Sequence, residues 1–158
     1  MSSSPKISVI TPVFNSDRFL AETIESVRSQ SFQDYEHLIV IDSKSSDSSE
    51  QIARRFSEID PRIRLIFDPS ALGPARNRNL GIDQARGEFL CFIDADDLWT
   101  KGKLERQIKF AIENNFDFCF TSFIRVSENL TKKSPEPHIP PAVSYRDLLK
   151  FNFISSHT

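Results

Sequence analysis

The sequence predicts an α/β fold in which a mostly parallel β-sheet is flanked by helices. Short apolar runs rich in Val, Ile and aromatic residues alternate along the chain with longer segments whose apolar residues recur at helical spacing. The first apolar runs also end in polar loops, as strands of an open parallel sheet do at their carboxyl ends. With 158 residues, the chain is long enough for one such domain.

The expected strands share a short apolar core bounded by turn residues, and they cover residues 6–12, 35–41, 63–67, 89–93 and 117–126. The run at 89–93 is apolar throughout, which is typical of a strand buried on both faces. The alternation at 117–126 is imperfect. Helices are expected at residues 18–29, around 52–56, at 75–85, at 100–112 and, as a short last helix, at 144–150. Right-handed crossovers should connect successive parallel strands.

The helix at 75–85 places two cations, Arg76 and Arg78, in its first turns. The helix macrodipole makes positive charge unfavourable there, so a compensating anion is expected nearby. Gly81 lies inside the same helix and costs about 1 kcal/mol relative to Ala, which indicates close packing against another backbone at that position.

Composition narrows the classes of function. The formal charge is −2, from 20 basic and 22 acidic residues, so duplex nucleic acid is not an expected partner. No apolar run approaches the roughly 20 residues of a membrane span, and residues 1–5 lack the character of a signal peptide. We therefore expect a soluble, cytoplasmic protein. Cys91 and Cys119 fall in expected strands, where they should pack as small apolar residues.

Two parts are expected along the chain. Residues 1–127 form the α/β domain, whereas residues 128–158 comprise a Pro-rich loop, a short helix and the start of a further region. The sequence stops at Thr158 without a closing element, which leads us to expect that it is part of a longer protein.

An acidic turn follows the fourth expected strand. Asp94, Asp96 and Asp97 place three carboxylates within four positions, where they would repel one another unless a cation or hydrogen-bond donors compensate. Mg²⁺ and Mn²⁺ prefer carboxylate oxygens and keep open positions for phosphate. The turn is therefore a candidate metal site for a diphosphate, and the alternative is a solvated acidic turn that caps the next helix.

Parallel strands would bring four segments to one rim of the sheet: residues 11–15, Asp42, residues 94–97 and the loop at 73–78. Asp42 and the first of these segments could bind a base and ribose, while a metal and the guanidinium of Arg76 could bind a diphosphate. The common glycine-rich phosphate loops are absent from the sequence. Phosphate binding should therefore depend on the metal.

Three motifs occur in the order of a known family: SVITPVFN at residues 8–15, IDSKSSD at 41–47, and ARNRNLGI at 75–82 followed by DADDLW at 94–99. In combination they resemble the inverting family 2 glycosyltransferases of the GT-A (Rossmann-like) fold, over about residues 6–127. The resemblance implies transfer of a sugar from a nucleotide-diphosphate donor to an acceptor hydroxyl, in polysaccharide biosynthesis. It also implies that residues 1–127 form the domain that binds the nucleotide-sugar donor and that residues 128–158 include the start of the acceptor-side region.

The resemblance also implies roles for individual residues in the donor site. Thr11, Pro12 and Phe14 would line the base. Asp42 would hydrogen-bond the uracil or ribose, and Asp94 would contact the ribose.

For the diphosphate, the resemblance implies that Arg76 approaches it and that Asp96, with Asp97, binds Mn²⁺ or Mg²⁺ in a DXD motif. The metal would neutralise the departing nucleoside diphosphate. The donor would be a UDP-sugar and the acceptor a glycan or a lipid-linked molecule. A lipid-linked acceptor would bring peripheral contact with a membrane, although the sequence has no basic amphipathic helix to support it.

The sequence departs from the family pattern at two places. Lys44 stands where the family usually has glycine, which puts a positive charge near the donor. The catalytic base of the family lies beyond the matched region, and neither Glu136 nor Asp147 has the setting of a base. We expect the base beyond Thr158.

Other readings of the acidic turn are weaker. A phosphatase would carry its nucleophilic aspartate after the first strand, and a nucleotidyltransferase would have a glycine-rich loop there. A glycosidase needs two carboxylates roughly 5–9.5 Å apart on either side of a sugar ring, and adjacent carboxylates on one turn are poorly placed for this separation. The alternative that remains is a catalytically incomplete domain that binds a nucleotide-sugar without turnover.

Overall fold

The structure is a computed structural model that describes residues 4–127, 131, 140 and 142–150. The chain divides into two compact units, the first ending at Arg106 and the second beginning at Gln107. The elements in chain order are β1 (Ile7–Val13), α1 (Leu20–Arg28), β2 (Tyr35–Asp42), α2 (Ser49–Ile59), β3 (Ile63–Asp68), α3 (Pro74–Gln84), β4 (Phe89–Phe92), α4 (Lys103–Asn114) and α5 (Tyr145–Leu148). The division between residues 127 and 128 stays a prediction.

The first unit is built on a four-stranded sheet in the order β3-β2-β1-β4. All three strand pairs are parallel, with Val9 opposite both His37 of β2 and Cys91 of β4. The chain moves outward from β1 to β3 and then returns to the other side of β1 to form β4. This reversal creates a topological switch point between β1 and β4, which is where open α/β sheets bind their ligands.

Two hydrophobic cores form because neighbouring residues of a strand face opposite sides of the sheet. On one side, Val13, Ile39 and Ile41 pack with Leu20 and Ile24 of α1. On the other side, the core contains three fully buried strand residues and the partly buried side chains that pack on them: Ile10, Leu38, Val40, Ile66, Leu80, Ala85 and Phe92. The central strands β1 and β2 are thus buried on both faces. The expectation that the run at 89–93 is buried on both faces was wrong, because β4 is an edge strand of the described sheet and Leu90 is 41% exposed.

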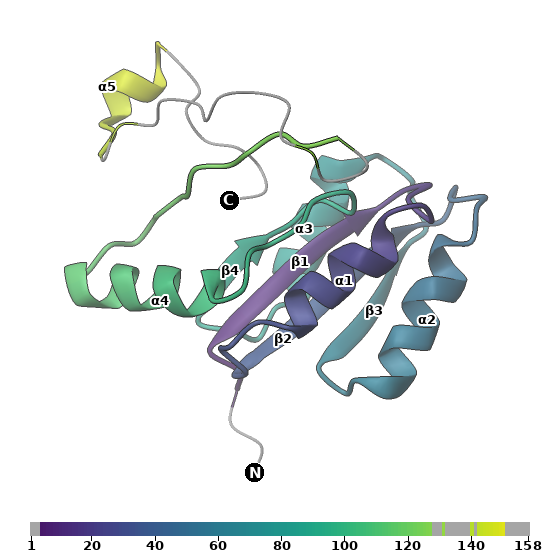
Figure 1. Ribbon diagram of the computed structural model, residues 1–158. Helices are drawn as coiled ribbons and strands as arrows, with labels where there is room; N and C mark the ends of the chain where they lie inside the picture. Colours follow the sequence, from purple (N-terminus) through teal and green to yellow (C-terminus); the bar gives the residue numbers. More distant parts are fainter. Residues whose placement is uncertain (1–3, 128–130, 132–139, 141, 151–158) are drawn as a thin grey trace. The chain divides into compact units, whose positions relative to one another are not determined.

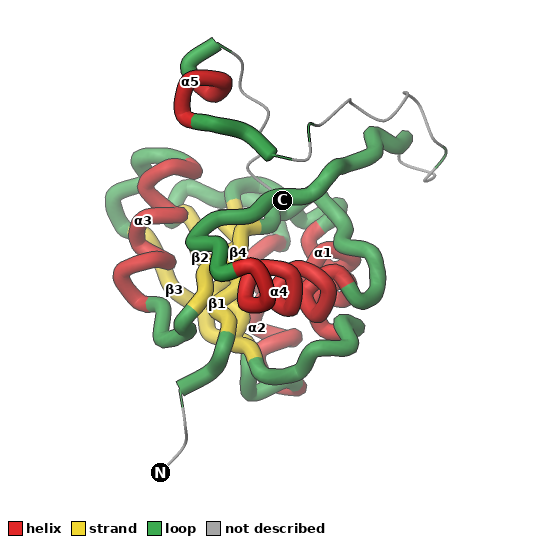
Figure 2. Tube along the Cα trace, turned by 90° about the vertical axis from the view of Figure 1, so that its left-hand side faces the viewer, coloured by secondary structure: helices red, strands yellow, loops and turns green. Residues whose placement is uncertain are grey.

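The helices of the first unit form two layers around this sheet. Figures 1 and 2 show α1 and α2 on one face and α3 on the other. Gly81 explains how closely α3 approaches, because a Cβ atom added there would lie 2.5 Å from Cγ2 of Ile10. The expected α/β fold with a parallel sheet flanked by helices is confirmed. Gly81 does pack closely, but against the side chain of Ile10 rather than against another backbone as expected.

The expected strand at residues 117–126 was wrong. Within the described residues this segment is irregular, and only Val126 forms an isolated bridge. Phe118 and Ile124 are 62% and 49% exposed, so the alternation does not bury one face, and a strand without pairing partners is not stable. Cys119 therefore does not lie in a strand, whereas Cys91 lies in β4; both are partly buried and neither forms a disulfide.

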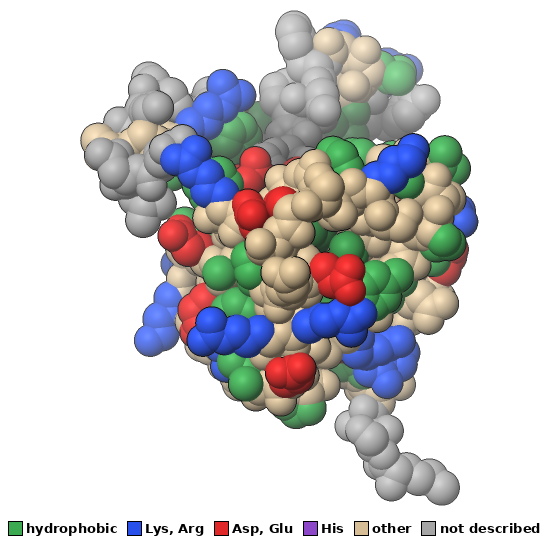
Figure 3. Space-filling model, turned by 90° about the vertical axis from the view of Figure 1, so that its right-hand side faces the viewer, with side chains coloured by type: hydrophobic (Ala, Val, Ile, Leu, Met, Phe, Trp, Pro, Cys, Tyr) green, Lys and Arg blue, Asp and Glu red, His purple; other side chains and the backbone are tan. Residues whose placement is uncertain are grey.

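Two surface properties complete the description. Acidic and basic side chains are interspersed on the face shown in Figure 3, in keeping with a formal charge of −2. Within residues 4–127 and the described positions that follow, no helix is both long and apolar enough to cross a membrane.

Candidate functional site

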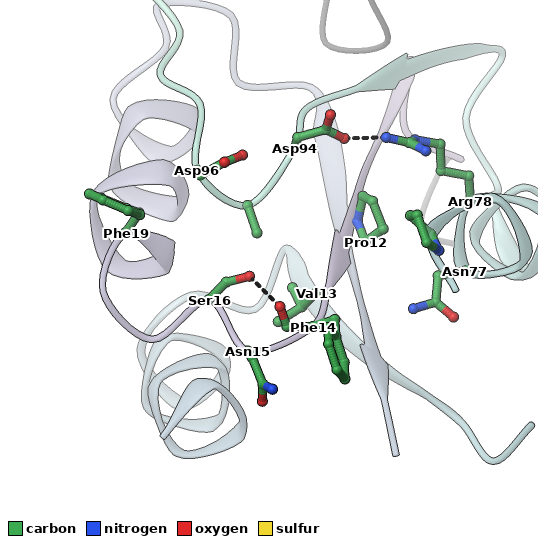
Figure 4. Close-up of a pocket in the computed structure, with 12 residues that line it drawn as sticks. Pro12, Val13, Phe14, Asn15, Ser16, Phe19, Asn77, Arg78, Asp94 and Asp96 are labelled. Carbon is green, nitrogen blue, oxygen red and sulfur yellow. Dashed lines mark hydrogen bonds and ion pairs between the residues drawn. The ribbon is translucent and has the colours of Figure 1, made fainter. Parts of the chain in front are cut away.

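A cavity of about 450 Å³ opens at the carboxyl ends of β1 and β4, at the topological switch point. Twelve residues line it: Pro12, Val13, Phe14, Asn15, Ser16, Phe19, Pro74, Asn77, Arg78, Asp94, Ala95 and Asp96. They come from the end of β1, the loop after it, the start of α3 and the turn after β4 (Figure 4). Its volume is within the usual range for small-molecule and cofactor sites.

Hydrogen bonds from two other elements hold the acidic turn after β4 in place. The backbone N–H of Ile93 donates to the carbonyl of Ile10 at 3.1 Å, which extends the pairing with β1 past the end of β4. The hydroxyl of Thr23 in α1 donates to the carbonyl of Ala95 at 2.9 Å. Asp94 and Asp96, on either side of Ala95, are thereby fixed at the cavity wall.

The loop after β1 is bonded to the loop after β2. The side-chain oxygen of Asn15 accepts a hydrogen bond from the backbone N–H of Ser46 at 2.8 Å, and the N–H of Ser16 donates to the hydroxyl of Ser49 at 2.8 Å. Asn15 has a φ of 45°, a conformation that asparagine tolerates better than most residues. These bonds hold the Asn15–Ser16 wall of the cavity in one conformation.

The opposite wall is the beginning of α3. Gly73, with a φ of 90°, precedes Pro74 at the first helical position, and this pairing starts the helix at the cavity. Asn77 is 1% exposed, and its Oδ1 has no hydrogen-bond partner. Arg78 donates through Nη2 to Oδ1 of Asp94, as Figure 4 shows, while its buried Nε has no hydrogen-bond partner. This wall therefore offers polar atoms to a ligand.

Four of the residues expected in the site line the cavity: Pro12, Phe14, Asp94 and Asp96. Phe14 is 53% exposed, which leaves its ring open to a ligand. The strand-end argument works for these residues because the carboxyl ends of adjacent parallel strands meet at one edge of the sheet.

The other four expected residues do not line the cavity. Thr11 is fully buried, and its hydroxyl lies 2.8 Å from Nε2 of the buried His37. The carboxylate of Asp42 is buried and accepts the backbone N–H of Lys44 at 2.9 Å, which closes the turn after β2. Arg76 is exposed on α3, where its charge helps to lower the pKa of Asp68, after the larger effect of the Ser70 hydroxyl.

Asp97 is the last of the four. Its backbone N–H donates to the carbonyl of Asp94 at 3.1 Å and closes the acidic turn, with its side chain partly buried. The glycine replaced by Lys44 is not needed here, because the residues at 43 and 44 keep a negative φ. Among the described residues, the non-glycine positions with a positive φ are Asn15, Ala71 and Asn115.

Sequence reasoning missed Asn77 and Arg78, although helical periodicity contains the signal. Pro74, Asn77, Arg78 and Gly81 are spaced i, i+3, i+4 and i+7, so they share one face of α3. Gly81 was expected to pack closely, and the residues on its face should therefore turn inward. Arg76 lies outside this series and faces away.

The cavity fits a divalent cation only in part. Among the described residues, no group of three or more His, Cys, Asp or Glu side chains could hold a metal by itself. The exposed carboxylate of Asp96 makes no hydrogen bond or ion pair with another described residue. Mg²⁺ typically binds one or two carboxylates together with substrate phosphates, so Asp96 fits a cation that arrives with a diphosphate.

The comparison with protein families agrees with this geometry. The family described as Glycosyl transferase family 2 matches residues 8–157, nearly the whole sequence. The chain belongs to glycosyl transferase family 2. Its parallel sheet and flanking helices are those of the GT-A fold, as the three sequence motifs predicted.

Individual relatives show the same likeness. The chain is 34% identical over 145 residues to the Escherichia coli enzyme named UDP-Glc:alpha-D-GlcNAc-diphosphoundecaprenol beta-1,3-glucosyltransferase WfgD, covering 91% of this chain and 55% of that protein. S. aureus TarS 1-349 in complex with UDP-GlcNAc is 31% identical with a TM-score of 0.65, over 70% of this chain and 32% of that one.

A third relative is the mannosyltransferase PcManGT from Pyrobaculum calidifontis, in complex with GDP-Man and Mn²⁺. It is 26% identical with a TM-score of 0.63, over 70% of this chain and 33% of that one. The chain spans 17–61% of the length of the curated relatives that it matches.

Asp147 has a structural role in the second unit. Its carboxylate accepts hydrogen bonds from the hydroxyl and the backbone N–H of Ser144, at 2.6 and 2.9 Å, at the start of α5. These bonds lower the pKa of Asp147, the larger part coming from the hydroxyl. A capping carboxylate with a lowered pKa is a poor general base. Glu136 lies outside the described residues.

Proposed function

We propose that this chain forms the donor-binding half of a metal-dependent, inverting glycosyltransferase that uses a UDP-sugar. The observation that carries the proposal is the cavity at the β1–β4 switch point. The Asp96 carboxylate, the Arg78–Asp94 pair and the exposed ring of Phe14 all line it. These groups suit a nucleoside diphosphate: an aromatic ring can stack on the base, one carboxylate can accept a hydrogen bond from a ribose hydroxyl, and a second carboxylate can bind the cation of the diphosphate.

In this proposal the nucleoside lies along the β1 side of the cavity. The half-exposed ring of Phe14 stacks on the base, a contact that is worth about 1–3 kcal/mol for a nucleic-acid base. Pro12 forms the floor beneath it. The carboxylate of Asp94, oriented by Arg78, accepts a hydrogen bond from a ribose hydroxyl.

The diphosphate lies toward the acidic turn. Asp96 would hold Mn²⁺ or Mg²⁺ together with the phosphate oxygens of the donor, and Asp97 closes the turn that presents Asp96. When bound, the cation supplies electrostatic stabilisation of the negative charge that develops on the departing nucleoside diphosphate. Asp42 and Arg76 have no contact with the donor in this proposal.

Related proteins support the choice of nucleotide and acceptor. The E. coli relative is named for a UDP-glucose donor and a diphosphoundecaprenol-linked acceptor, and the S. aureus structure contains UDP-GlcNAc. We therefore propose a UDP-sugar as donor and a lipid-linked glycan as acceptor, in polysaccharide biosynthesis, with peripheral contact to the membrane that carries the acceptor.

Inversion requires a general base that deprotonates the acceptor hydroxyl. The cavity is lined by two carboxylates, Asp94 and Asp96, and both are assigned to the donor. We assign the role of base to no residue of the described part of the chain.

A panel of nucleotides tests the proposal. UDP, GDP and dTDP are titrated calorimetrically into the chain with and without Mn²⁺. We expect UDP to bind only weakly without the metal and at least about tenfold more tightly with it. The reason is that the cation neutralises the repulsion between the Asp96 carboxylate and the diphosphate of UDP. Tighter binding of GDP would contradict the choice of base, and failure of all three nucleotides to bind would contradict the proposed site.

A further inference from the structure

The cavity contains two carboxylates of the same chemical type. Asp94 and Asp96 are two positions apart and both line the wall, so residue type does not decide which binds a cation and which accepts a hydrogen bond from a hydroxyl. Both offer hard oxygen ligands. Something outside the acidic turn must distinguish them.

Arg78 distinguishes the two carboxylates. Its Nη2 donates to Oδ1 of Asp94, and the two side chains are 23% and 26% exposed, so this pair is not a fully solvated surface contact. Asp96, in contrast, is exposed and makes no hydrogen bond or ion pair with another described side chain. A guanidinium beside Asp94 would also repel a divalent cation placed there, because like charges a few ångströms apart interact strongly in a partly buried site.

The position of Arg78 is set by the packing of α3. Gly81, one turn further along the same face, lies against Ile10 of β1. Ile10 is paired with Phe92 of β4, and Phe92 lies two residues before Asp94. The helix can therefore neither rotate nor move away without opening this contact. Arg78 is consequently held where it meets the end of β4.

Asn77 and Arg78 add a second sign that this wall was built for a polar ligand. Oδ1 of Asn77 and Nε of Arg78 are both buried without hydrogen-bond partners. An unsatisfied buried polar group costs about 1–3 kcal/mol, which makes it unusual in a surface that has no ligand to satisfy it.

We propose that Arg78 is a positioning residue that gives the two carboxylates different tasks: it holds Asp94 for a ribose hydroxyl of the donor and leaves Asp96 to the cation. This inference rests on the proposed donor site and gives a role to a residue of the third motif to which the resemblance assigned none. It also explains why a helix tolerates a cation so near its N-terminus, since Asp94 supplies the compensating anion.

The test compares Arg78→Met with the matched control Arg76→Met, which removes the same charge from the exposed face of the same helix. UDP, 2′-deoxy-UDP and 3′-deoxy-UDP are titrated calorimetrically into each protein in the presence of Mn²⁺. The unmodified chain should bind one of the deoxy analogues about tenfold more weakly than UDP, the size expected for one hydrogen bond to a charged group. Arg78→Met should reduce this ratio to within about twofold, and Arg76→Met should preserve it.

A second readout is the Mn²⁺ concentration that gives half-maximal UDP binding. It should fall in Arg78→Met, because Asp94 loses its guanidinium partner and becomes available to the cation, and it should stay unchanged in Arg76→Met. Asp94→Asn keeps the size of the side chain and should lose the same discrimination between UDP and the deoxy analogue without lowering the Mn²⁺ requirement.

The possible outcomes distinguish a failure of the inferred role of Arg78 from a failure of the proposed donor-binding function. Equal weakening of UDP and both deoxy analogues in Arg78→Met would overturn the inference, because Arg78 would then contact the diphosphate or serve the fold alone. Loss of discrimination in Arg76→Met would overturn it as well. If the unmodified chain bound none of the three nucleotides, the proposed function would fail and the inference with it.

Discussion

The carboxylate of Asp47 accepts a hydrogen bond from the backbone N–H of Asp17, 2.8 Å away, and joins the loop after β2 to the loop after β1. A second hydrogen bond joins the same two loops in the opposite direction: the carboxylate of Asp17 accepts one from the backbone N–H of Ser48 at 3.3 Å. Burial alone would raise the pKa of Asp47, but hydrogen bonds from Asp17 and Ser49 lower it below its usual value. Asp47 is therefore ionised at neutral pH and fastens the cavity wall formed by Asn15 and Ser16.

We predict that Asp47→Ala lowers the free energy of unfolding by about 1–2 kcal/mol, because two backbone N–H groups lose their acceptor. UDP affinity should fall about three- to tenfold, since the loosened wall must be ordered on binding. Urea denaturation and calorimetry measure the two effects. Glu58→Ala, an exposed acid of α2, is the control and should change neither quantity. Unchanged stability in Asp47→Ala would show that the two loops do not depend on this bond.

Phe14 should contribute to binding without contributing much to stability. Its ring is 53% exposed at the cavity, so Phe14→Ala removes little buried surface but a stacking partner for the base. We expect UDP binding to weaken about tenfold, and thermal unfolding to stay nearly unchanged. Phe110→Ala, which removes an equally exposed ring that does not line the cavity, is the control. Equal UDP affinity in the two variants would exclude Phe14 as the base platform.

The buried Glu36 should make stability depend on pH. Burial alone would raise its pKa, but hydrogen bonds from Arg64, Arg86 and Ser8 lower it from 4.5 to about 2. Because the pKa is lower in the folded state, the ionised carboxylate stabilises the fold above pH 4.5, and this stabilisation is lost as the pH falls toward 2.

We therefore predict that Glu36→Gln lowers the free energy of unfolding at pH 7 by about 3 kcal/mol, and that the difference shrinks as the pH is lowered below the ordinary pKa of glutamate. Denaturant titrations at a series of pH values measure this. Glu22→Gln, at an exposed position of α1, serves as the control. A difference that stays constant with pH would mean that Glu36 acts through packing rather than through charge.

Gly81 tests the closeness of α3 to the sheet. Alanine is the better helix former by about 1 kcal/mol, yet a Cβ at this position would lie 2.5 Å from Cγ2 of the fully buried Ile10. We expect Gly81→Ala to destabilise the protein by about 1–3 kcal/mol. In an Ile10→Ala background the same change should become neutral or stabilising, and a double-mutant cycle measures this coupling. Additive effects would show that the contact is not tight.

Most of the fold could be predicted because its signals are local. The expected strands at 6–12, 35–41 and 63–67 correspond to β1, β2 and β3, and no end differs by more than one residue. The agreement is close because turn residues bound these apolar runs. The strand expected at 117–126 failed because pairing is a tertiary property that an apolar segment does not reveal by itself.

The candidate site was predictable where it depends on the ends of strands. Pro12, Phe14, Asp94 and Asp96 line the cavity because they lie at or just after the carboxyl ends of neighbouring parallel strands. Thr11 did not meet this expectation in the structure, because alternation along β1 turns its hydroxyl into the core toward His37.

The arginines of α3 illustrate the limit of a motif. The order of residues predicted a cation at the cavity, but the phase of the helix decides which one points inward. Arg78 shares the inner face with Gly81 and meets Asp94, whereas Arg76 is exposed. The same helical phase would have identified Arg78 from the sequence if Gly81 had been used to orient the helix.

The central claim is that Asp96 binds a divalent cation together with the donor diphosphate, and one measurement tests it most directly. UDP is titrated calorimetrically, with and without Mn²⁺, into the unmodified chain, into Asp96→Ala and into the control Asp83→Ala, which removes an exposed carboxylate of α3 outside the cavity. We predict that Mn²⁺ strengthens UDP binding at least about tenfold in the unmodified chain and in Asp83→Ala, and that this gain disappears in Asp96→Ala. An equal gain with Mn²⁺ in all three proteins would contradict the account.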